Sequence, residues 1–221
     1  MCLIVLAWRA HPRFRLIVAA NRDEFHARKA APAAFWRDQP QILAGLDLQA
    51  MGTWMGVSRS GKFAAVTNYR GAREASAAES RGALVTGFLA DGAMPAAYMT
   101  SVAARAASYS GFNLLASDRS ELWWMSNRDG APRRLEPGYY ALGNLLLDSS
   151  DVQPLKQRMA DTPPAVEALF GVVSQAKIVN PGYGTRCSTV LLDEGKQVRY
   201  AERAFGPDGT EDATAQFQFS T

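Results

Sequence analysis

The sequence predicts an α+β protein built on mostly antiparallel sheets, and three observations support this prediction. Apolar runs of strand length come in pairs joined by short turns, helical patterns come in two separate groups, and several runs are almost entirely apolar. A strand that is apolar on both sides must be covered on both faces, so we expect an antiparallel core between helical layers. With 48% hydrophobic residues, the chain has enough apolar mass to fold as one domain over residues 1–221.

The first strands predict two hairpins. Residues 3–8 and 16–20 are apolar runs on either side of a Pro-containing turn, "RAHPR", and the second run leads into "NRDEF". Residues 26–47 are rich in Ala and Pro, which predicts irregular chain anchored by Phe35 and Trp36. "GTWMGVS" and "KFAAVTNY" then form the second hairpin across the turn "RSG".

The first helical group follows this hairpin. Ser80 is the predicted N-cap of a helix, and four apolar side chains after it share one helical face: Leu84, Val85, Phe88 and Leu89. The Ala-rich segment "MPAAYMTSVAARAASYS" predicts a second helix with Pro95 in its first turn.

The rest of the chain alternates strands and helices once more. "GFNLLAS", "ELWWMS" and "YYALGN" predict strands, and shorter helices are expected over residues 152–160 and 165–175. The chain ends in the strand patterns "TRCSTVLLD", "QVRYAERAF" and "AQFQFS". Grouped hairpins and grouped helices favour the α+β class over alternating βαβ units.

Composition and charge exclude several classes of function. The net charge of +3 is mild and no run of Lys or Arg occurs, which argues against a nucleic-acid partner. No apolar stretch approaches the roughly 20 residues of a membrane span, and no basic segment precedes Leu3 as in a signal peptide, so we expect a cytoplasmic protein. Cys2 and Cys187 are then expected as free thiols. They lack the CxxC spacing of a metal site, and only His11 and His26 offer imidazoles, so we expect no metal.

Cys2 is the residue whose position points most directly to chemistry. Removal of Met1, which is usual before a small residue, would leave a free α-amino group on the residue that carries the thiol. The amine has a reference pKa of about 7.7–8.0 and the thiol of about 8.5, so the amine can act as a base near neutral pH. Nucleophile and base would then belong to one residue, as in an N-terminal nucleophile.

Other polar residues gather at predicted strand ends. Asp23 could orient the ammonium group, Arg186 could favour the thiolate, and an amide such as Asn144 could stabilise an oxyanion. Taken singly, such residues also suit turn caps, and Arg22 with Glu24 also suits a solvated ion pair.

Eight blocks, in chain order from Cys2 to about Phe205, resemble the NRDE family, also known as the transport and Golgi organization protein 2 family. They are "MCLI", "AANRDEF", "GTWMGVS", "TNYR", "SRG", "GFNLL", "SNR" and "GYGTRCSTV". The resemblance implies the N-terminal-nucleophile hydrolase fold, a four-layer αββα sandwich. It also implies kinship with bile-salt hydrolases and penicillin V acylases, which cleave amides with an N-terminal cysteine.

Carried over by position, the resemblance implies five catalytic residues. Cys2 matches the nucleophile, and Asp23 matches the aspartate after the second strand. The backbone N–H of Asn68 and the side chain of Asn144 match the oxyanion donors, and Arg186 matches the late catalytic arginine. We expect four further residues to contact the substrate: Asn21, Arg22, Trp54 and Tyr69.

The chain departs from those hydrolases at one position. They carry an arginine three residues before the aspartate, where this chain has Ala20, and Arg22 directly precedes Asp23. Because neighbours on a strand face opposite sides, we expect Arg22 to point away from the thiol and Arg186 to be the remaining cation. By the same alternation Cys187 should face away from the site as a small core residue.

Two functions of different classes follow. The first is a cysteine hydrolase that acts on an amide or thioester of a hydrophobic acyl compound. The second is a non-catalytic protein that binds and traffics haem, lipid or acyl-CoA, because members of the family are linked to haem mobilisation and lipid homeostasis. In both cases the expected partner is a small hydrophobic acyl or haem-like ligand. No cofactor is expected, haem entering only as cargo because the chain has no haem motif. A protein-interaction module is the third alternative.

Overall fold

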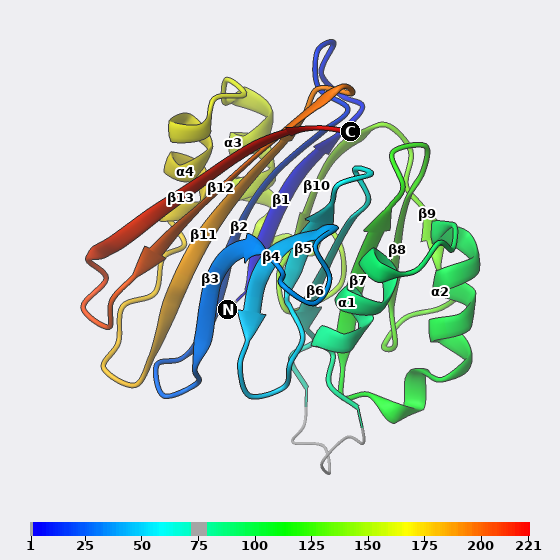
Figure 1. The fold of residues 1–221 in the computed structure, drawn as a ribbon, viewed down its shortest axis with the longest axis horizontal. Coiled ribbons are helices and arrows are strands. Elements are labelled where there is room, and N and C mark those ends of the chain that lie inside the picture. Colours follow the sequence, from blue (N-terminus) through cyan, green and yellow to red (C-terminus); the bar gives the residue numbers. More distant parts are fainter. Residues whose placement is uncertain (1, 72–78) are drawn as a thin grey trace. The chain divides into compact units, whose positions relative to one another are not determined.

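The computed structural model describes residues 2–71 and 79–221, in which strands, helices, strands, helices and strands follow one another (Figure 1). By internal contacts the chain divides into two compact units. The first comprises the chain up to Pro32, Pro137–Gly143 and Leu147–Thr221, and the second comprises Ala33–Glu136 and Asn144–Leu146. Each unit has a sheet with helices packed against it, which confirms the α+β class.

The sheet of the first unit is antiparallel throughout its described pairs and contains the predicted first hairpin. Its described strands lie in the order β10 (Gly138–Leu142), β1 (Leu3–Trp8), β2 (Leu16–Phe25), β11 (Tyr183–Asp193), β12 (Gln197–Phe205), β13 (Glu211–Ser220). The chain's first strand therefore lies inside the sheet, where all six of its residues are buried. This placement fixes the position of Cys2, which directly precedes it.

Helices α3 (Gln153–Asp161) and α4 (Val166–Ser174) pack on one face of that sheet. The residues of β1 that contact them are Leu3, Val5 and Ala7, as the alternation of side chains along a strand requires. They share a core with helix residues such as Phe170. The opposite face of β1 is also buried, which explains why the run is apolar at every position.

The second unit repeats this plan with a wider sheet. Its described strands lie in the order β3 (Ala30–Phe35), β4 (Ile42–Asp47), β5 (Met55–Ser58), β6 (Phe63–Asn68), β7 (Phe112–Ser117), β8 (Leu122–Ser126), β9 (Arg133–Arg134). From β4 to β9 the neighbours are antiparallel, and β5 with β6 is the predicted second hairpin. Helices α1 (Gly82–Ala90) and α2 (Pro95–Ala104) pack against it through the predicted apolar face of α1.

Two local predictions are wrong. Residues 26–47 are not irregular, because they contribute β3 and β4. Ser80 is not the N-cap of α1: Arg81 occupies that position and no side chain caps the helix there. The helices predicted over 152–160 and 165–175 are confirmed within one residue at each end as α3 and α4.

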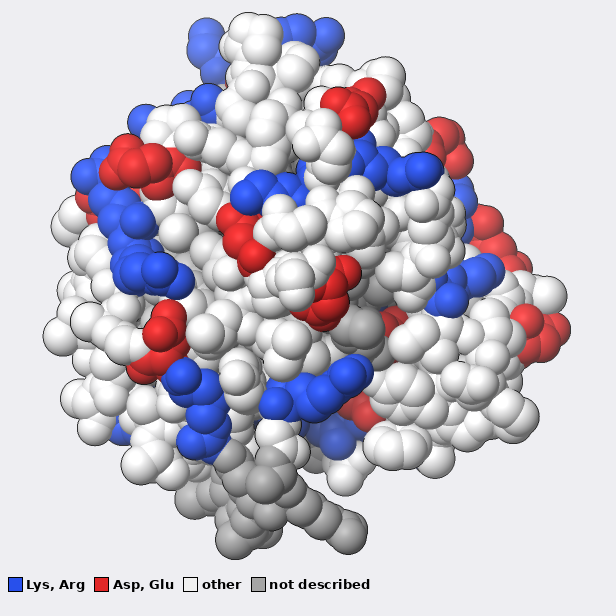
Figure 2. All heavy atoms as spheres, turned by 180° about the vertical axis from the view of Figure 1, so that it is seen from behind, with Lys and Arg blue, Asp and Glu red and all other residues white. Residues whose placement is uncertain are grey.

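The surface and the helices add two observations. On the face shown in Figure 2, basic and acidic side chains are interspersed, as the mild net charge of the chain suggests. Within residues 2–71 and 79–221, no helix is long and apolar enough to cross a membrane.

Candidate functional site

Cys2 lies at the entrance of β1, next to the end of β2. The register that pairs Leu3 with Asn21 brings the residue before Leu3 alongside Arg22 and Asp23. The half-buried Cys2 thiol donates a hydrogen bond to the backbone carbonyl of Asp23, with 3.7 Å between sulfur and oxygen. The pairing of β1 with β2 therefore holds the Cys2 thiol against Asp23 of β2.

Asp23 is itself fixed by β11. Its carboxylate accepts a hydrogen bond from the Thr185 hydroxyl, with 2.6 Å between Oγ1 and Oδ1, and only 4% of the residue is exposed. Its carbonyl also accepts a hydrogen bond from the Tyr183 hydroxyl at 3.2 Å. One carbonyl oxygen thus receives both the Cys2 thiol and the Tyr183 hydroxyl, which ties the candidate nucleophile to two strands.

Burial dominates the electrostatics of this group. Burial raises the pKa of the Cys2 thiol above its ordinary value, and the charge of Asp23 raises it further. The hydrogen bond to the Asp23 carbonyl and the charge of Arg22 lower this pKa, but they do not outweigh the effect of burial. Burial also raises the pKa of Asp23, while the Thr185 hydrogen bond lowers it. The thiol is therefore protonated at neutral pH and needs a base to become a nucleophile.

The charge of Arg22 acts on the Cys2 thiol, although the sequence predicted that Arg22 points away from it. In an antiparallel pair, directly opposed residues share a face; the last described pair is Leu3 with Asn21, and the next positions along the two chains are Cys2 and Arg22. Arg22 is buried, and its charge lowers the pKa of both Cys2 and Cys187. The thiol contacts the backbone carbonyl of Asp23 and not its side chain, so the direction of the Asp23 side chain does not fix which neighbours the thiol has.

Cys187 is buried, as predicted, but it does not face away from this group. A β-bulge between Thr185 and Cys187 makes Arg186 the extra residue, so that Thr185 pairs with Asp23 and Cys187 pairs with Arg22. Burial raises the pKa of Cys187 well above its ordinary value, and a charge on Cys2 raises it further.

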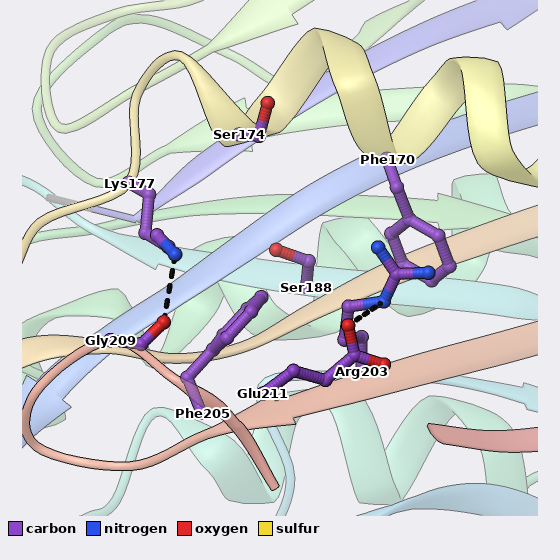
Figure 3. Close-up of a pocket in the computed structure, with 8 residues that line it drawn as sticks. All are labelled: Phe170, Ser174, Lys177, Ser188, Arg203, Phe205, Gly209 and Glu211. Carbon is purple, nitrogen blue, oxygen red and sulfur yellow. Dashed lines mark hydrogen bonds and ion pairs between the residues drawn. The ribbon is translucent and has the colours of Figure 1, made fainter. Parts of the chain in front are cut away.

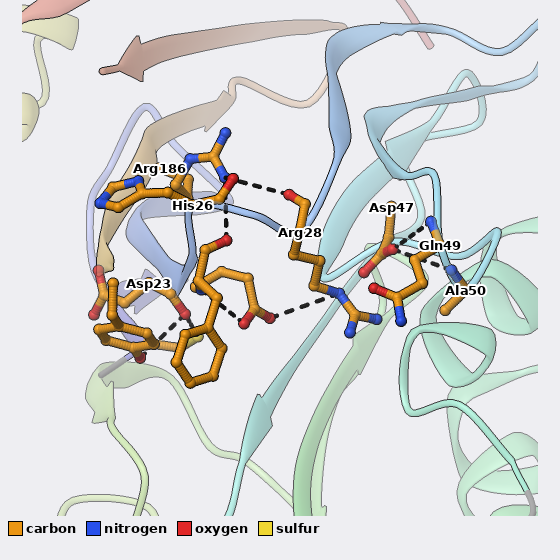
Figure 4. Close-up of polar contacts among 11 residues, drawn as sticks. Asp23, His26, Arg28, Asp47, Gln49, Ala50 and Arg186 are labelled. Carbon is orange, nitrogen blue, oxygen red and sulfur yellow. Dashed lines mark hydrogen bonds and ion pairs between the residues drawn. The ribbon is translucent and has the colours of Figure 1, made fainter. Parts of the chain in front are cut away.

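Arg186 holds the chain that follows β2. One of its guanidinium nitrogens donates to three backbone carbonyls, those of Phe25 at 3.3 Å, His26 at 3.1 Å and Arg28 at 3.3 Å (Figure 4). His26 in turn lies 3.0 Å through Nε2 from the carbonyl of Asn180. These contacts make Arg186 a support for the turn beside the candidate site.

Asn21 links β2 to α4 and β11. Its side-chain nitrogen donates to the Val173 carbonyl at 2.9 Å, and its side-chain oxygen accepts from the Ser188 hydroxyl at 2.6 Å. Only 3% of Asn21 is exposed, so its amide is engaged inside the unit. These two hydrogen bonds fix the Asn21 side chain, and its contact with a substrate stays a prediction.

The remaining predicted residues belong to the second unit. The Asn144 side chain donates to the carbonyl of Asn68 at 2.6 Å, and the Asn144 carbonyl accepts from the backbone N–H of Arg70 at the same distance. Tyr69 lies between these two contacts in sequence and is half-buried, as is Trp54 ahead of β5. The second unit therefore brings Asn68, Tyr69 and Asn144 together. The first unit brings together Cys2, Arg22 and Asp23.

Sequence reasoning missed Tyr183, Thr185 and Phe25. Tyr183 and Thr185 stand in the block "GYGTRCSTV", whose spacing alone does not show that they reach Asp23. Phe25 is 62% exposed and packs edge to face with Tyr183, their ring centroids 5.2 Å apart. Among the described residues, no three His, Cys, Asp or Glu side chains come together as a metal site would require.

The α+β fold of this chain is shared with a solved amidase. A solved structure of a Caenorhabditis elegans N-acylethanolamine-hydrolyzing acid amidase ortholog is similar to this chain, with a TM-score of 0.54 over 86% of this chain and 92% of that one. At 14% sequence identity this likeness concerns the fold alone.

Sequence comparison places the chain more narrowly. The family model for Transport and Golgi organisation 2 matches residues 1–168. The Transport and Golgi organization protein 2 homolog of Bos taurus is 33% identical over 99% of both chains, and the Homo sapiens homolog is 33% identical over 92% of this chain and 93% of its own length. The chain belongs to the Transport and Golgi organisation 2 family.

Proposed function

We propose that this protein is an N-terminal cysteine hydrolase that cleaves an amide or a thioester of a hydrophobic acyl compound. The observation that carries the proposal is the hydrogen bond from the Cys2 thiol to the Asp23 carbonyl, within a group that Thr185 and Tyr183 hold in place. A thiol one residue from the start of the chain and fixed between buried strands suits a nucleophile better than a frayed terminus does.

The raised pKa of the thiol defines what the reaction requires. Because Cys2 is protonated at neutral pH, a base must remove its proton before attack. Removal of Met1 supplies that base as the α-amino group of Cys2, whose reference pKa is about 7.7–8.0. The sulfur then attacks the acyl carbon, the leaving amine or thiol takes up the proton, and water releases the carboxylic acid from the acyl-enzyme.

The hydrophobic substrate class is supported by Phe25. This exposed ring packs against Tyr183, whose hydroxyl shares the Asp23 carbonyl with the Cys2 thiol. An exposed ring that packs on a half-buried tyrosine so closely tied to the nucleophile offers an apolar acyl chain a surface to cover. The oxyanion roles of Asn68 and Asn144 and a catalytic role of Arg186 stay predictions. In this proposal the protein acts in the cytoplasm, where reducing conditions keep the thiol free.

Intact-mass analysis before and after an electrophilic thiol probe tests the proposal. We expect the purified protein to lack Met1, to take up one probe molecule rapidly, and to hydrolyse long-chain N-acyl amides or acyl-CoA thioesters. Cys2→Ser should lose rapid labelling and turnover. Cys187→Ser is the matched control, because Cys187 is a buried thiol, 5% exposed, and its removal should leave labelling intact. Retention of Met1, or equal turnover by Cys2→Ser, contradicts the proposal.

A second function, ligand binding without turnover, is favoured by the same raised pKa, because a protonated thiol is a poor nucleophile. In that case the protein binds haem, lipid or acyl-CoA and releases it unchanged. Titration of the Cys2→Ser variant separates the two functions. Saturable acyl-CoA binding or a Soret shift with haem, without turnover by the wild-type protein, supports binding alone.

A further inference from the structure

The first unit contains a cavity of about 190 Å³ on the face of its sheet that α4 covers (Figure 3). Six of the residues that line it matter here: Phe170, Ser174, Lys177, Ser188, Arg203 and Phe205. We propose that this cavity is a binding site for a small carboxylic acid with a flat apolar body, its carboxylate bound by Lys177. The proposal goes beyond the hydrolase function and holds whether or not Cys2 turns over.

Arg203 is not the group that binds the ligand. Its guanidinium forms ion pairs with Glu167 at 3.0 Å and with Glu211 at 3.1 Å, and it lies over the ring of Phe170 at 4.3 Å from the centroid. Two carboxylates therefore already neutralise this cation. Arg203 lines the cavity next to Phe170, and its ion pair with Glu211 neutralises the one carboxylate among the lining residues.

Lys177 is differently placed. Its ammonium donates to the carbonyl of Gly209 at 2.9 Å and lies 4.7 Å from the centroid of the Phe205 ring. Within residues 2–71 and 79–221 it forms no ion pair with a carboxylate. An ammonium has three N–H donors, so donors remain for an anion.

The charge of Lys177 acts on one exposed acidic group, Asp208. Hydrogen bonds from Thr210 lower the pKa of Asp208, and the Lys177 charge adds a smaller lowering. This carboxylate is exposed to solvent and accepts its hydrogen bonds from Thr210, at 2.6 Å from the hydroxyl. Solvent screens such a charge, so it does not replace a ligand at Lys177.

The walls define the rest of the ligand. The rings of Phe170 and Phe205 line the cavity, and Figure 3 shows Ser188 between the Lys177 and Arg203 sides. Since a water takes up about 30 Å³, the cavity holds roughly six waters or one ring-sized molecule. Of the charged groups that line the cavity, Arg203 and Glu211 are paired with each other, which leaves Lys177 as the cation for a ligand. Aromatic walls beside such a cation suit a benzoate-like acid, in which the ring lies between the walls and the carboxylate reaches Lys177.

Ser188 shows that the cavity is built into the unit. It is 3% exposed, and its hydroxyl donates to Asn21, which in turn donates to the Val173 carbonyl of α4. Asn21 pairs with Leu3, the residue after Cys2. Ser188, which lines the cavity, is therefore joined by one hydrogen bond to β2, the strand that pairs with β1 beside the candidate nucleophile.

Titration with 4-fluorobenzoate, followed by ¹⁹F NMR on the full chain, tests the site. We expect saturable binding with a Kd on the order of 1 mM, as suits a ligand of about ten heavy atoms. Lys177→Met should weaken binding at least about tenfold, because a charge-assisted hydrogen bond is lost. Lys196→Met is the matched control, since Lys196 is an exposed lysine of the same unit, and it should bind like the wild type.

The neutral analogue 4-fluorobenzyl alcohol makes the test independent of any variant. On the wild-type protein it should bind at least about tenfold more weakly than the acid. Three results would overturn the proposal: no saturable binding up to about 20 mM acid, equal weakening by Lys177→Met and Lys196→Met, or equal affinity for the acid and the alcohol.

Discussion

Thr185→Val tests the interaction that holds Asp23 in the candidate site. The substitution keeps the shape of the side chain and removes a hydroxyl that donates to the Asp23 carboxylate at 2.6 Å and accepts from the backbone N–H of Ile178 at 2.9 Å. A hydrogen bond to a charged group contributes about 1.5–3 kcal/mol and a neutral one about 1 kcal/mol. We expect Thr185→Val to lower the free energy of unfolding by about 3 kcal/mol at pH 7.

The pH dependence distinguishes the two lost bonds. Folding raises the pKa of Asp23, so its contribution to stability is most favourable below its ordinary pKa of 3.8 and is lost as pH rises through the raised value. Losing the Thr185 bond raises this pKa further, so the variant should lose more stability at neutral pH than in acid. With Asp23 protonated, the loss should shrink toward the roughly 1 kcal/mol of the Ile178 bond.

Urea denaturation of the wild type, Thr185→Val and Thr185→Ser at pH 7 and in mild acid measures these differences. Thr185→Ser retains the hydroxyl and should keep most of the stability at both pH values. A Thr185→Val loss that does not change with pH, or one below about 0.5 kcal/mol at pH 7, would refute the assignment of this bond to an ionised, buried Asp23.

Three further predictions concern other described contacts. Because burial raises the pKa of Cys2, the rate at which iodoacetamide alkylates this thiol should still rise above pH 9, as mass spectrometry can follow. Because the Arg22 charge lowers the same pKa, Arg22→Gln should slow the alkylation several-fold at pH 8. Arg186→Met should cost about 1–2 kcal/mol and speed hydrogen exchange in the turn after β2, while unchanged exchange there would contradict its supporting role. Tyr98→Phe removes a buried hydrogen bond of 2.7 Å to the Leu84 carbonyl and should lower thermal stability by about 1 kcal/mol, whereas a neutral effect would count against that bond.

The elements that the sequence predicted well are those whose periodicity is strong. Strands β1 and β2 are continuous apolar runs, and their pairing follows from the short turn between them. Strands β3 and β4 were not predicted because their residues have low strand propensity. "AAPAAF" has a proline and four alanines, and "ILAGLD" contains glycine and ends in aspartate. Their place in the sheet comes from pairing with neighbours, a tertiary effect that local propensity does not carry.

The candidate site likewise contains residues that the sequence could predict and residues that it could not. Cys2 and Asp23 could be predicted because both lie near the open end of one hairpin, Cys2 just before β1 and Asp23 among the last three residues of β2. Tyr183 and Thr185 could not, because they reach Asp23 across 160 and 162 residues of sequence through the pairing of β11 with β2. Long-range register depends on which strands become neighbours, and the pattern of one strand does not contain it.

The bulge at Arg186 explains why simple alternation failed in β11. In a regular strand Thr185 and Cys187, two positions apart, would share a face. With one residue inserted, Thr185 pairs with Asp23 and Cys187 with Arg22, and those two neighbours on β2 face opposite sides. One strand thereby places a hydroxyl on the Asp23 carboxylate and a second thiol beside Arg22, while the extra residue supports the turn through its guanidinium. The chemistry proposed for Cys2 thus depends on an irregularity in β11 as much as on β1 itself, which is why mutations around residue 186 should disturb the thiol without contacting it.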